Sequence, residues 1–233
     1  MAMSLELSRI SALIFDVDGT LRDTDDQMVL TLEKWLRIGS FFFPGREPRS
    51  LARWLVMKTE TPGNFVFGLP DRLGIDERLA RLGNLLRRAG LRRSTNTFLI
   101  IQGVREMLAR LQPYYPMSVV SARDKRTTMA FLDQFELTPF FQYVATAHTC
   151  RYTKPYPDPL LWVAERMGVP IENCLMIGDT TVDIRAGIAA GAQTVGVLCG
   201  FGEQCELERI GADLILANTP ALAEVLLKND VNI

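Results

Sequence analysis

The sequence carries almost no surplus charge. Its 26 Lys+Arg and 27 Asp+Glu residues leave a formal net charge of -1 at pH 7, and it holds a single histidine. Proteins that bind nucleic acid usually present a strongly basic face, and this charge balance gives no reason to expect one. We therefore predict that nucleic acid is not a partner.

The sequence also lacks the marks of disulfide-linked, zinc-binding, secreted and membrane-spanning proteins. Its four cysteines show neither CxxC pairing nor the spacing of zinc ligands, so we expect reduced thiols. No apolar stretch approaches the roughly 18 residues that a membrane span requires. A secretory signal has a basic region, then an apolar region, then a cleavage site with small residues, and residues 1–9 lack this order. These absences predict a cytoplasmic location and no membrane partner.

Short apolar runs are what the sequence does contain. Ala12–Phe15 is continuously apolar and ends in a polar turn with glycine, which is typical of a strand buried on both faces of a parallel sheet. Segments with the helical spacing of apolar residues, Val104–Leu111 and Thr128–Phe135, lie between such runs. The other runs are residues 117–120, 143–145, 174–177 and 194–197. This alternation predicts an α/β fold with a parallel sheet.

Residues 22–98 follow a different pattern. They contain helical patterns at residues 24–36, 49–57 and 76–89 and no convincing buried strand. We therefore predict an all-helical insertion over residues 22–98 within an α/β core made of residues 1–21 and 99–233.

Polar clusters follow several of the predicted strands. Asp16 and Asp18 come directly after the first strand, Ser121 follows Val120, and Asp179 follows the run that ends at Ile177. Ligands of open α/β sheets bind beyond the carboxyl ends of the strands, so we expect these side chains to converge there. Taken alone, the Asp16–Asp18 pair has an equally good structural explanation, because such residues also cap turns.

Together these residue types suit phosphoryl transfer. A carboxylate such as Asp16 can attack a phosphate monoester only if cations neutralise the phosphoryl oxygens. Asp16 and Asp179 offer the hard oxygen ligands that Mg²⁺ prefers, with Asp183 at the metal or supporting its ligands. Lys154 supplies a mobile positive charge. We therefore predict a Mg²⁺ site beside a carboxylate nucleophile.

The remaining candidate residues are assigned to proton transfer and to phosphate binding. Asp18 is placed to protonate the departing alkoxide and then to accept a proton from the attacking water. The Ser121 hydroxyl is expected to donate to the phosphoryl group. Gly19 permits a tight turn in which backbone amides approach a phosphate, and we place Thr20 and Ala122 in the same phosphate-binding group.

These motifs resemble those of the haloacid dehalogenase-like hydrolase superfamily. The resemblance rests on DxDGT at residues 16–20, Ser121 after a strand, Lys154, and GDxxxD at residues 178–183. It implies a Rossmann-like core with an inserted helical cap, and a Mg²⁺ ion that also takes the Asp18 backbone carbonyl. Residues 18–24, the Lys154-Pro155-Tyr156-Pro157 segment and residues 211–213 resemble the phosphoglycolate phosphatase-like and β-phosphoglucomutase-like branch.

The resemblance implies a phosphatase that acts on a small phosphorylated metabolite. One departure stands out, because many relatives have asparagine where this chain has Ala122, followed here by Arg123. Asp18 argues against a dehalogenase, which needs no acid for its leaving group. A phosphosugar mutase uses the same core and stays open, as does a non-catalytic binding protein built on this fold. The sequence does not reveal the oligomeric state.

Overall fold

The structure, a computed structural model, describes residues 5–23 and 98–227. The chain divides into two units, Met1–Leu30 with Phe98–Ile233 and Thr31–Thr97, and every described residue belongs to the first, the core unit. The predicted helical cap over residues 22–98 therefore lies outside the described residues except for Arg22, Asp23 and Phe98.

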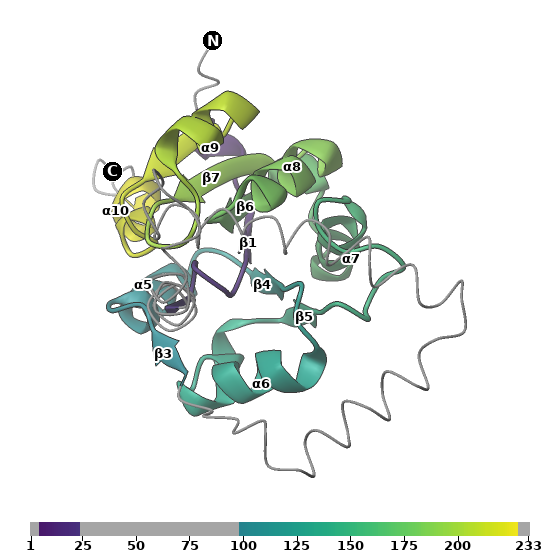
Figure 1. The fold of residues 1–233 in the computed structure, drawn as a ribbon, viewed down its shortest axis with the longest axis vertical. Helices are drawn as coiled ribbons and strands as arrows, with labels where there is room; N and C mark the ends of the chain where they lie inside the picture. Colours follow the sequence, from purple (N-terminus) through teal and green to yellow (C-terminus); the bar gives the residue numbers. More distant parts are fainter. Residues whose placement is uncertain (1–4, 24–97, 228–233) are drawn as a thin grey trace, which may run out of the picture. The chain divides into compact units, whose positions relative to one another are not determined.

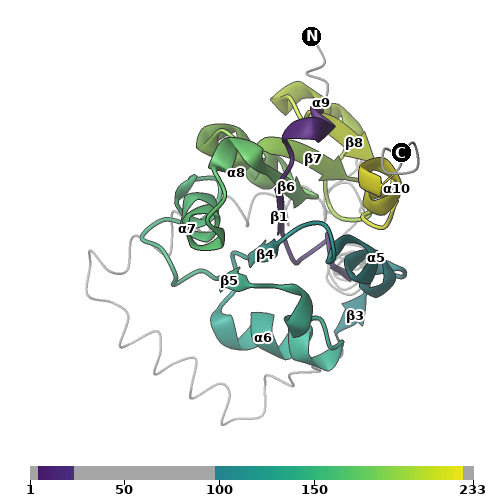
Figure 2. The ribbon, with the colours of Figure 1, turned by 180° about the vertical axis from the view of Figure 1, so that it is seen from behind.

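A parallel sheet of six strands forms the centre of the core unit. The strand order is β5-β4-β1-β6-β7-β8, so β1 lies between β4 and β6 (Figures 1 and 2). All five neighbouring pairs run parallel. The strands are β1 (Ala12–Phe15), β4 (Met117–Val120), β5 (Tyr143–Ala145), β6 (Cys174–Gly178), β7 (Gln193–Val197) and β8 (Leu214–Leu216). The predicted α/β fold with a parallel sheet is confirmed.

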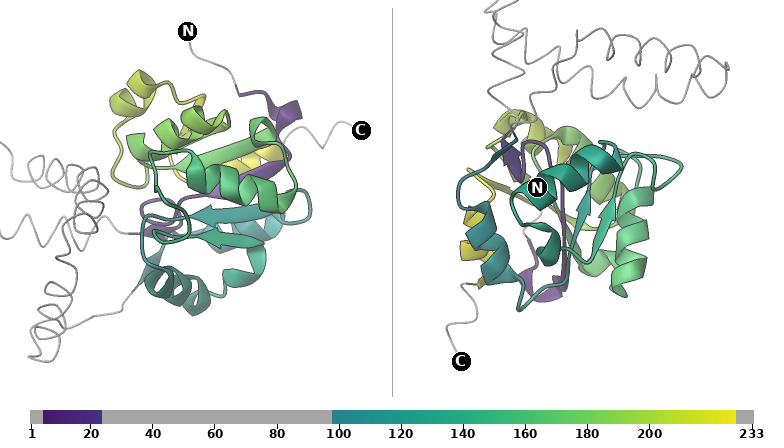
Figure 3. Two further views of the ribbon diagram at one scale, coloured as in Figure 1. Left: turned by 90° about the vertical axis from the view of Figure 1, so that its right-hand side faces the viewer. Right: turned by 90° about the horizontal axis from the view of Figure 1, so that it is seen from below.

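Helices cover both faces of this sheet (Figure 3). One face packs against α5, α6 and α10, and the other packs against α7 and α8. The helices are α5 (Val104–Leu111), α6 (Lys125–Gln134), α7 (Asp158–Met167), α8 (Thr181–Ala190), α9 (Gln204–Ile210) and α10 (Ala221–Leu227). Among the described residues, no helix combines the length and apolar character needed to cross a membrane.

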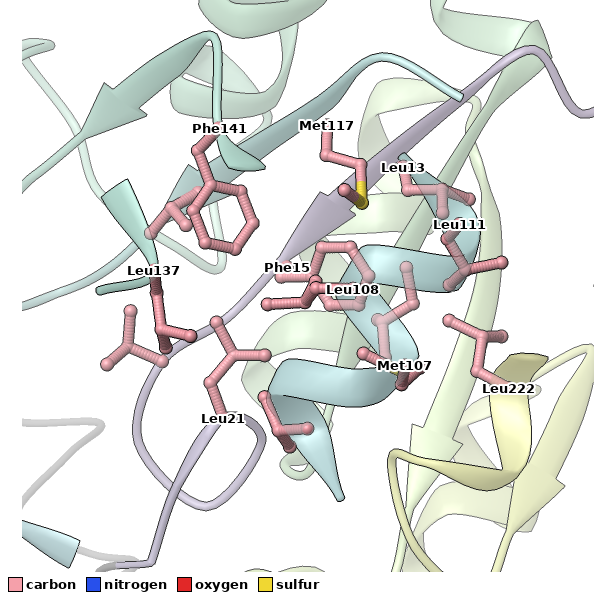
Figure 4. Packing of buried hydrophobic residues seen from close by; sticks show 14 of the residues in the cluster. Leu13, Phe15, Leu21, Met107, Leu108, Leu111, Met117, Leu137, Phe141 and Leu222 are labelled. Carbon is pink, nitrogen blue, oxygen red and sulfur yellow. The ribbon is translucent and has the colours of Figure 1, made fainter. Parts of the chain in front are cut away.

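The apolar character of β1 follows from burial on both faces. Leu13 and Phe15 belong to the core cluster under α5, whereas Ala12 and Ile14 belong to the cluster under α7. Figure 4 shows Phe15 beside the α5 side chains at the centre of the first cluster. Alternate residues of a strand point to opposite faces, so a strand covered on both sides needs apolar residues at every position.

Three short strands were absent from the sequence-based prediction. Arg22–Asp23 (β2) pairs antiparallel with Leu99–Ile100 (β3), and Leu214–Leu216 (β8) forms one edge of the main sheet. Each is only two or three residues long and partly exposed. The two-residue strands are too short to display a strand's periodicity. β8 is an apolar run as long as the predicted Tyr143–Ala145 and was overlooked.

Candidate active site

The turn after β1 is closed by backbone hydrogen bonds. The carbonyl of Val17 accepts from the backbone N–H groups of Leu21 and Arg22 at 2.9 and 2.8 Å. Gly19 has φ 75°, in the left-handed region that glycine adopts without strain, and its N–H donates to the Arg22 carbonyl at 2.8 Å. The turn therefore holds Asp16 and Asp18 at the carboxyl end of the central strand.

Lys154 joins two of the predicted site carboxylates. Its Nζ donates to Asp16 Oδ1 at 2.5 Å and to Asp183 Oδ1 at 2.6 Å. The Lys154 side chain is only 3% exposed, so both ion pairs lie in a medium where charges interact strongly. The loop after β5 thus carries a positive charge to the end of β1, although 138 residues separate Lys154 from Asp16.

Asp183 caps the first turn of helix α8 as well as contacting Lys154. Its Oδ2 accepts hydrogen bonds from the backbone N–H of Thr180 at 3.0 Å and from the Thr180 hydroxyl at 2.7 Å. A carboxylate in the first turn also interacts favourably with the helix dipole. Asp183 therefore serves helix capping through one oxygen and the acidic cluster through the other.

Asp179 lies between two loops and is fully buried. Its Oδ2 accepts a hydrogen bond from the backbone N–H of Phe201, in the loop after β7, at 2.7 Å. This contact was missed by the sequence-based interpretation. The available signal was the Gly200-Phe201-Gly202 segment, which follows a buried strand as the other site loops do.

The acidic cluster suits a divalent cation. Asp16, Asp179 and Asp183 are all buried, and each offers a carboxylate oxygen within 4.8 Å of those of the other two. Carboxylate oxygens are the donors that Mg²⁺ binds. When all three are ionised, the single ammonium of Lys154 leaves two negative charges, which matches the charge of such an ion. These three residues could therefore hold Mg²⁺, and their role as ligands stays a prediction.

Burial changes how this cluster ionises. It raises the pKa of Asp16 to about 8 despite the opposing effect of Lys154, and the Asp183 and Asp18 carboxylates raise it further. Burial alone lowers the pKa of Lys154, but the Asp16 and Asp183 carboxylates outweigh it and raise that pKa above its ordinary value. The raised pKa of Asp16 means that Lys154 alone does not offset the negative charge of the ionised cluster. A bound cation would supply the additional positive charge.

Asp18 lies between two arginines that the sequence-based analysis did not place in the site. Arg123 donates from Nε to Asp18 Oδ2, and Arg22 Nη1 lies 3.4 Å from Asp18 Oδ1. The Asp18 side chain is 14% exposed, against 40% for Arg123. Arg123 follows Ala122, but nothing in the sequence indicated that its side chain reaches a residue 105 positions away.

The other predicted phosphate-binding residues occupy nearby loops. Ser121 is buried at the end of β4, where its Oγ accepts from the backbone N–H of Arg123 at 3.1 Å. Ala122 is exposed, and Gly19 is buried within its turn. Thr20 is fully buried, and its carbonyl accepts from the Thr219 hydroxyl at 2.6 Å. Phosphate binding by these four residues stays a prediction.

Comparisons with known proteins find similar hydrolases. The family model described as haloacid dehalogenase-like hydrolase matches residues 13–197. A phosphoglycolate phosphatase of Pseudomonas putida is 26% identical over 215 residues, which is 90% of this chain and 77% of that protein. The matched family segment includes all the acidic and basic residues of the site and ends before the loop Gly200-Phe201-Gly202.

Solved structures share the fold. A hydrolase from Pseudomonas syringae is 27% identical and aligns with a TM-score of 0.69 over 94% of this chain and 98% of that one. A haloacid dehalogenase-like family protein from Streptococcus pneumoniae aligns with a TM-score of 0.66 at 20% identity, covering 94% of this chain and 99% of that one. The second likeness concerns the fold alone.

Proposed function

Because the chain belongs to the haloacid dehalogenase-like hydrolase family, we propose that it is a Mg²⁺-dependent phosphatase in which Asp16 attacks the phosphorus of a small phosphate monoester. The observation that carries this proposal is the buried cluster of Asp16, Asp179 and Asp183 with the Lys154 ammonium on two of its members. A carboxylate nucleophile needs neighbouring positive charge to approach a phosphate dianion, and this cluster provides or attracts it.

In the first half of the reaction, an Asp16 oxygen forms a bond to phosphorus and the bond from phosphorus to the leaving oxygen breaks. Lys154 is positioned to offset the charge on the phosphoryl oxygens, because its Nζ lies 2.5 Å from the nucleophile. Bound Mg²⁺, held by Asp16, Asp179 and Asp183, would supply further charge neutralisation. Asp18 donates its proton to the leaving oxygen, so the product departs as an alcohol.

In the second half, water hydrolyses the phosphate on Asp16. Asp18, now ionised, accepts a proton from this water as its oxygen bonds to phosphorus, and the bond from phosphorus to Asp16 breaks. Inorganic phosphate leaves and Asp16 is restored as a carboxylate. Asp18 thus acts first as an acid and then as a base, which requires its side chain to stay near both the leaving oxygen and the water.

The relative named phosphoglycolate phosphatase supports a small anionic phosphate ester as the substrate. The test is phosphate release from an aryl phosphate and from a panel of phosphorylated metabolites that includes 2-phosphoglycolate, with Mg²⁺ and with a chelator. We expect release that requires Mg²⁺ and that is fastest for one member of the panel. Absence of release from every ester with Mg²⁺ present would contradict the proposed function.

Metal affinity is expected to rise with pH. The pKa of Asp16 in the metal-free protein is about 8, so at lower pH the metal must displace a proton from this carboxyl group. The apparent affinity for Mg²⁺ should therefore increase by about tenfold per pH unit between pH 6 and 8 and then level off. Calorimetric titration across this range measures it, and an affinity independent of pH would contradict the proton displacement.

Replacing Arg123 with alanine is expected to impair proton transfer by Asp18. The change removes a charged hydrogen bond worth about 1.5 to 3 kcal/mol. Because the arginine is partly exposed, we place the loss in kcat/KM near the low end, at about tenfold. The loss should be larger for an alkyl than for an aryl phosphate, because the alkoxide depends more on its acid.

The matched control for this variant is Arg126→Ala. Arg126 is an exposed arginine of α6, only three residues further along the chain. Kinetics of both variants on both esters separate a local effect from a general change of surface charge. Equal activity of Arg123→Ala and wild type on the alkyl ester would show that Arg123 does not assist proton transfer by Asp18.

A further inference from the structure

The side chain of Asp179 is enclosed by glycines from two loops. A Cβ atom on Gly19, in the turn after β1, would collide with the Asp179 carboxylate. A Cβ atom on Gly200, in the loop after β7, would collide with the same side chain, and one on Gly202 would collide with the Asp179 carbonyl oxygen. The absence of three side chains thus creates the space that Asp179 occupies.

Glycine is required at positions 200 and 202 because there is no space for a side chain, and not because of the backbone conformation. The glycines with positive φ include Gly19 but neither Gly200 nor Gly202. Their φ values therefore allow a residue with a side chain, and only the approach of Asp179 opposes one. Gly200 is the cleaner probe, because its nearest neighbours are side-chain atoms of Asp179 and not backbone.

The residue between these two glycines binds the same carboxylate. The Phe201 N–H donates to Asp179 Oδ2 at 2.7 Å, and the Phe201 side chain is itself buried. The loop thus limits the rotation of the Asp179 side chain by contact on one side and fixes one of its oxygens by a hydrogen bond. Outer partners of this kind orient metal ligands, and their loss typically weakens metal binding by about 10- to 100-fold.

We propose that the loop Gly200-Phe201-Gly202 is a positioning element that holds the Asp179 carboxylate in the orientation needed to bind the cation. This inference rests on the proposed magnesium site. The loop lies outside the four motifs described above. The role proposed for it concerns metal affinity and not the chemical step. The loop acts on the cation through Asp179, to which Phe201 donates and against which Gly200 packs, so its residues are positioning residues.

The decisive variant is Gly200→Ala in the full chain. Its added methyl group should push the Asp179 carboxylate from its place and weaken the binding of Mn²⁺, measured by electron paramagnetic resonance of the free ion without substrate. We expect a loss of about 10- to 100-fold. The comparison variant is Gly168→Ala, at the C-terminal end of α7, where an added Cβ meets no atom within 4 Å. Because Gly168 has φ 68°, alanine strains the backbone and lowers stability there, but it leaves the three carboxylates untouched, so this variant should bind Mn²⁺ as the wild type does.

A second measurement tests whether the added methyl group acts through Asp179. In the metal-free protein, Gly200→Ala should lower the melting temperature of the wild type. It should lower it much less in an Asp179→Gly background, where the whole colliding side chain, including its Cβ atom, is gone. If Gly200→Ala alone fails to fold, folding of the double variant supports the proposal. Failure of both, or an equal drop in both backgrounds, overturns it.

The outcomes separate this inference from the proposed function. A wild-type protein that binds no Mn²⁺ overturns the magnesium site and this inference with it. A wild type that binds Mn²⁺, together with Gly200→Ala that binds it equally well, overturns the role of the loop and leaves the proposed phosphatase intact.

Discussion

Replacement of Asp16 by asparagine is expected to abolish turnover. The amide keeps the size of the carboxylate but is a very poor nucleophile, so no phosphoryl group can be transferred to it. We expect the release of phosphate from any ester to fall by about a thousandfold or more, as loss of a nucleophile does in other enzymes. Steady-state assays on the best substrate of the panel measure this loss.

The matched control for Asp16→Asn is Asp18→Asn, two residues away in the same turn. It should slow the reaction differently, because an aryl leaving group departs without protonation whereas hydrolysis of the phosphate on Asp16 still needs a base. Asp18→Asn should therefore transfer a phosphoryl group once and then stall. If Asp16→Asn retained more than a few per cent of wild-type activity, another group would have to be the nucleophile.

Replacement of Lys154 by methionine is expected to damage both activity and stability. Removing one partner of a buried ion pair leaves an uncompensated charge and costs about 3 to 5 kcal/mol. Here the ammonium neutralises two buried carboxylates, Asp16 and Asp183, at 2.5 and 2.6 Å. Loss of the charge that faces the phosphoryl group should also reduce kcat/KM by about a hundredfold to a thousandfold.

The destabilisation by Lys154→Met should depend on pH. The folded-state pKa of Asp16, about 8, exceeds its ordinary value of 3.8, so folding favours the protonated form. The stability that this proton contributes is fully present below pH 3.8 and is lost as pH rises through about 8. Without the Lys154 ammonium, the ionised form of Asp16 is stabilised even less. The loss of folding stability in Lys154→Met should therefore be larger at pH 9, where Asp16 is ionised, than at pH 5.

Denaturant unfolding of the metal-free protein at the two pH values measures this effect. Lys125→Met is the control, because Lys125 is an exposed lysine at the start of α6. It should leave stability nearly unchanged, as substitutions of exposed residues usually do. A Lys154→Met protein as stable as the control at pH 9 would show that the buried carboxylates do not need this ammonium.

The central strands could be predicted because their environment restricts their composition. β1 and β6 are buried along their whole length, and every residue of both is apolar apart from the glycine that ends β6. β8 is a partly exposed edge strand of three apolar residues, as long as the predicted Tyr143–Ala145, and it was missed although its sequence carries the same signal. The cap lies outside the described residues, and its prediction from residues 22–98 is untested.

The positions of the site residues could be predicted from topology. Parallel strands bring their carboxyl ends to one edge, and this edge carries Asp16, Ser121 and Asp179 as expected from the order of the motifs. The contacts of Arg123 with Asp18 and of Phe201 with Asp179 could not be predicted in the same way. They depend on how loops approach one another across the sheet, and no local pattern records that approach.

A nucleophilic role of Asp16 is tested most directly by trapping the phosphoryl group on the protein. Asp18→Asn is mixed with an aryl phosphate and Mg²⁺, quenched in acid within one turnover and digested, and its peptides are analysed by mass spectrometry. If Asp16 is the nucleophile, one phosphoryl group lies on the peptide that contains Asp16, and none does when Asp16→Asn is combined with Asp18→Asn. A phosphoryl group on another residue, or phosphate release with no labelled peptide at any time, would contradict this role.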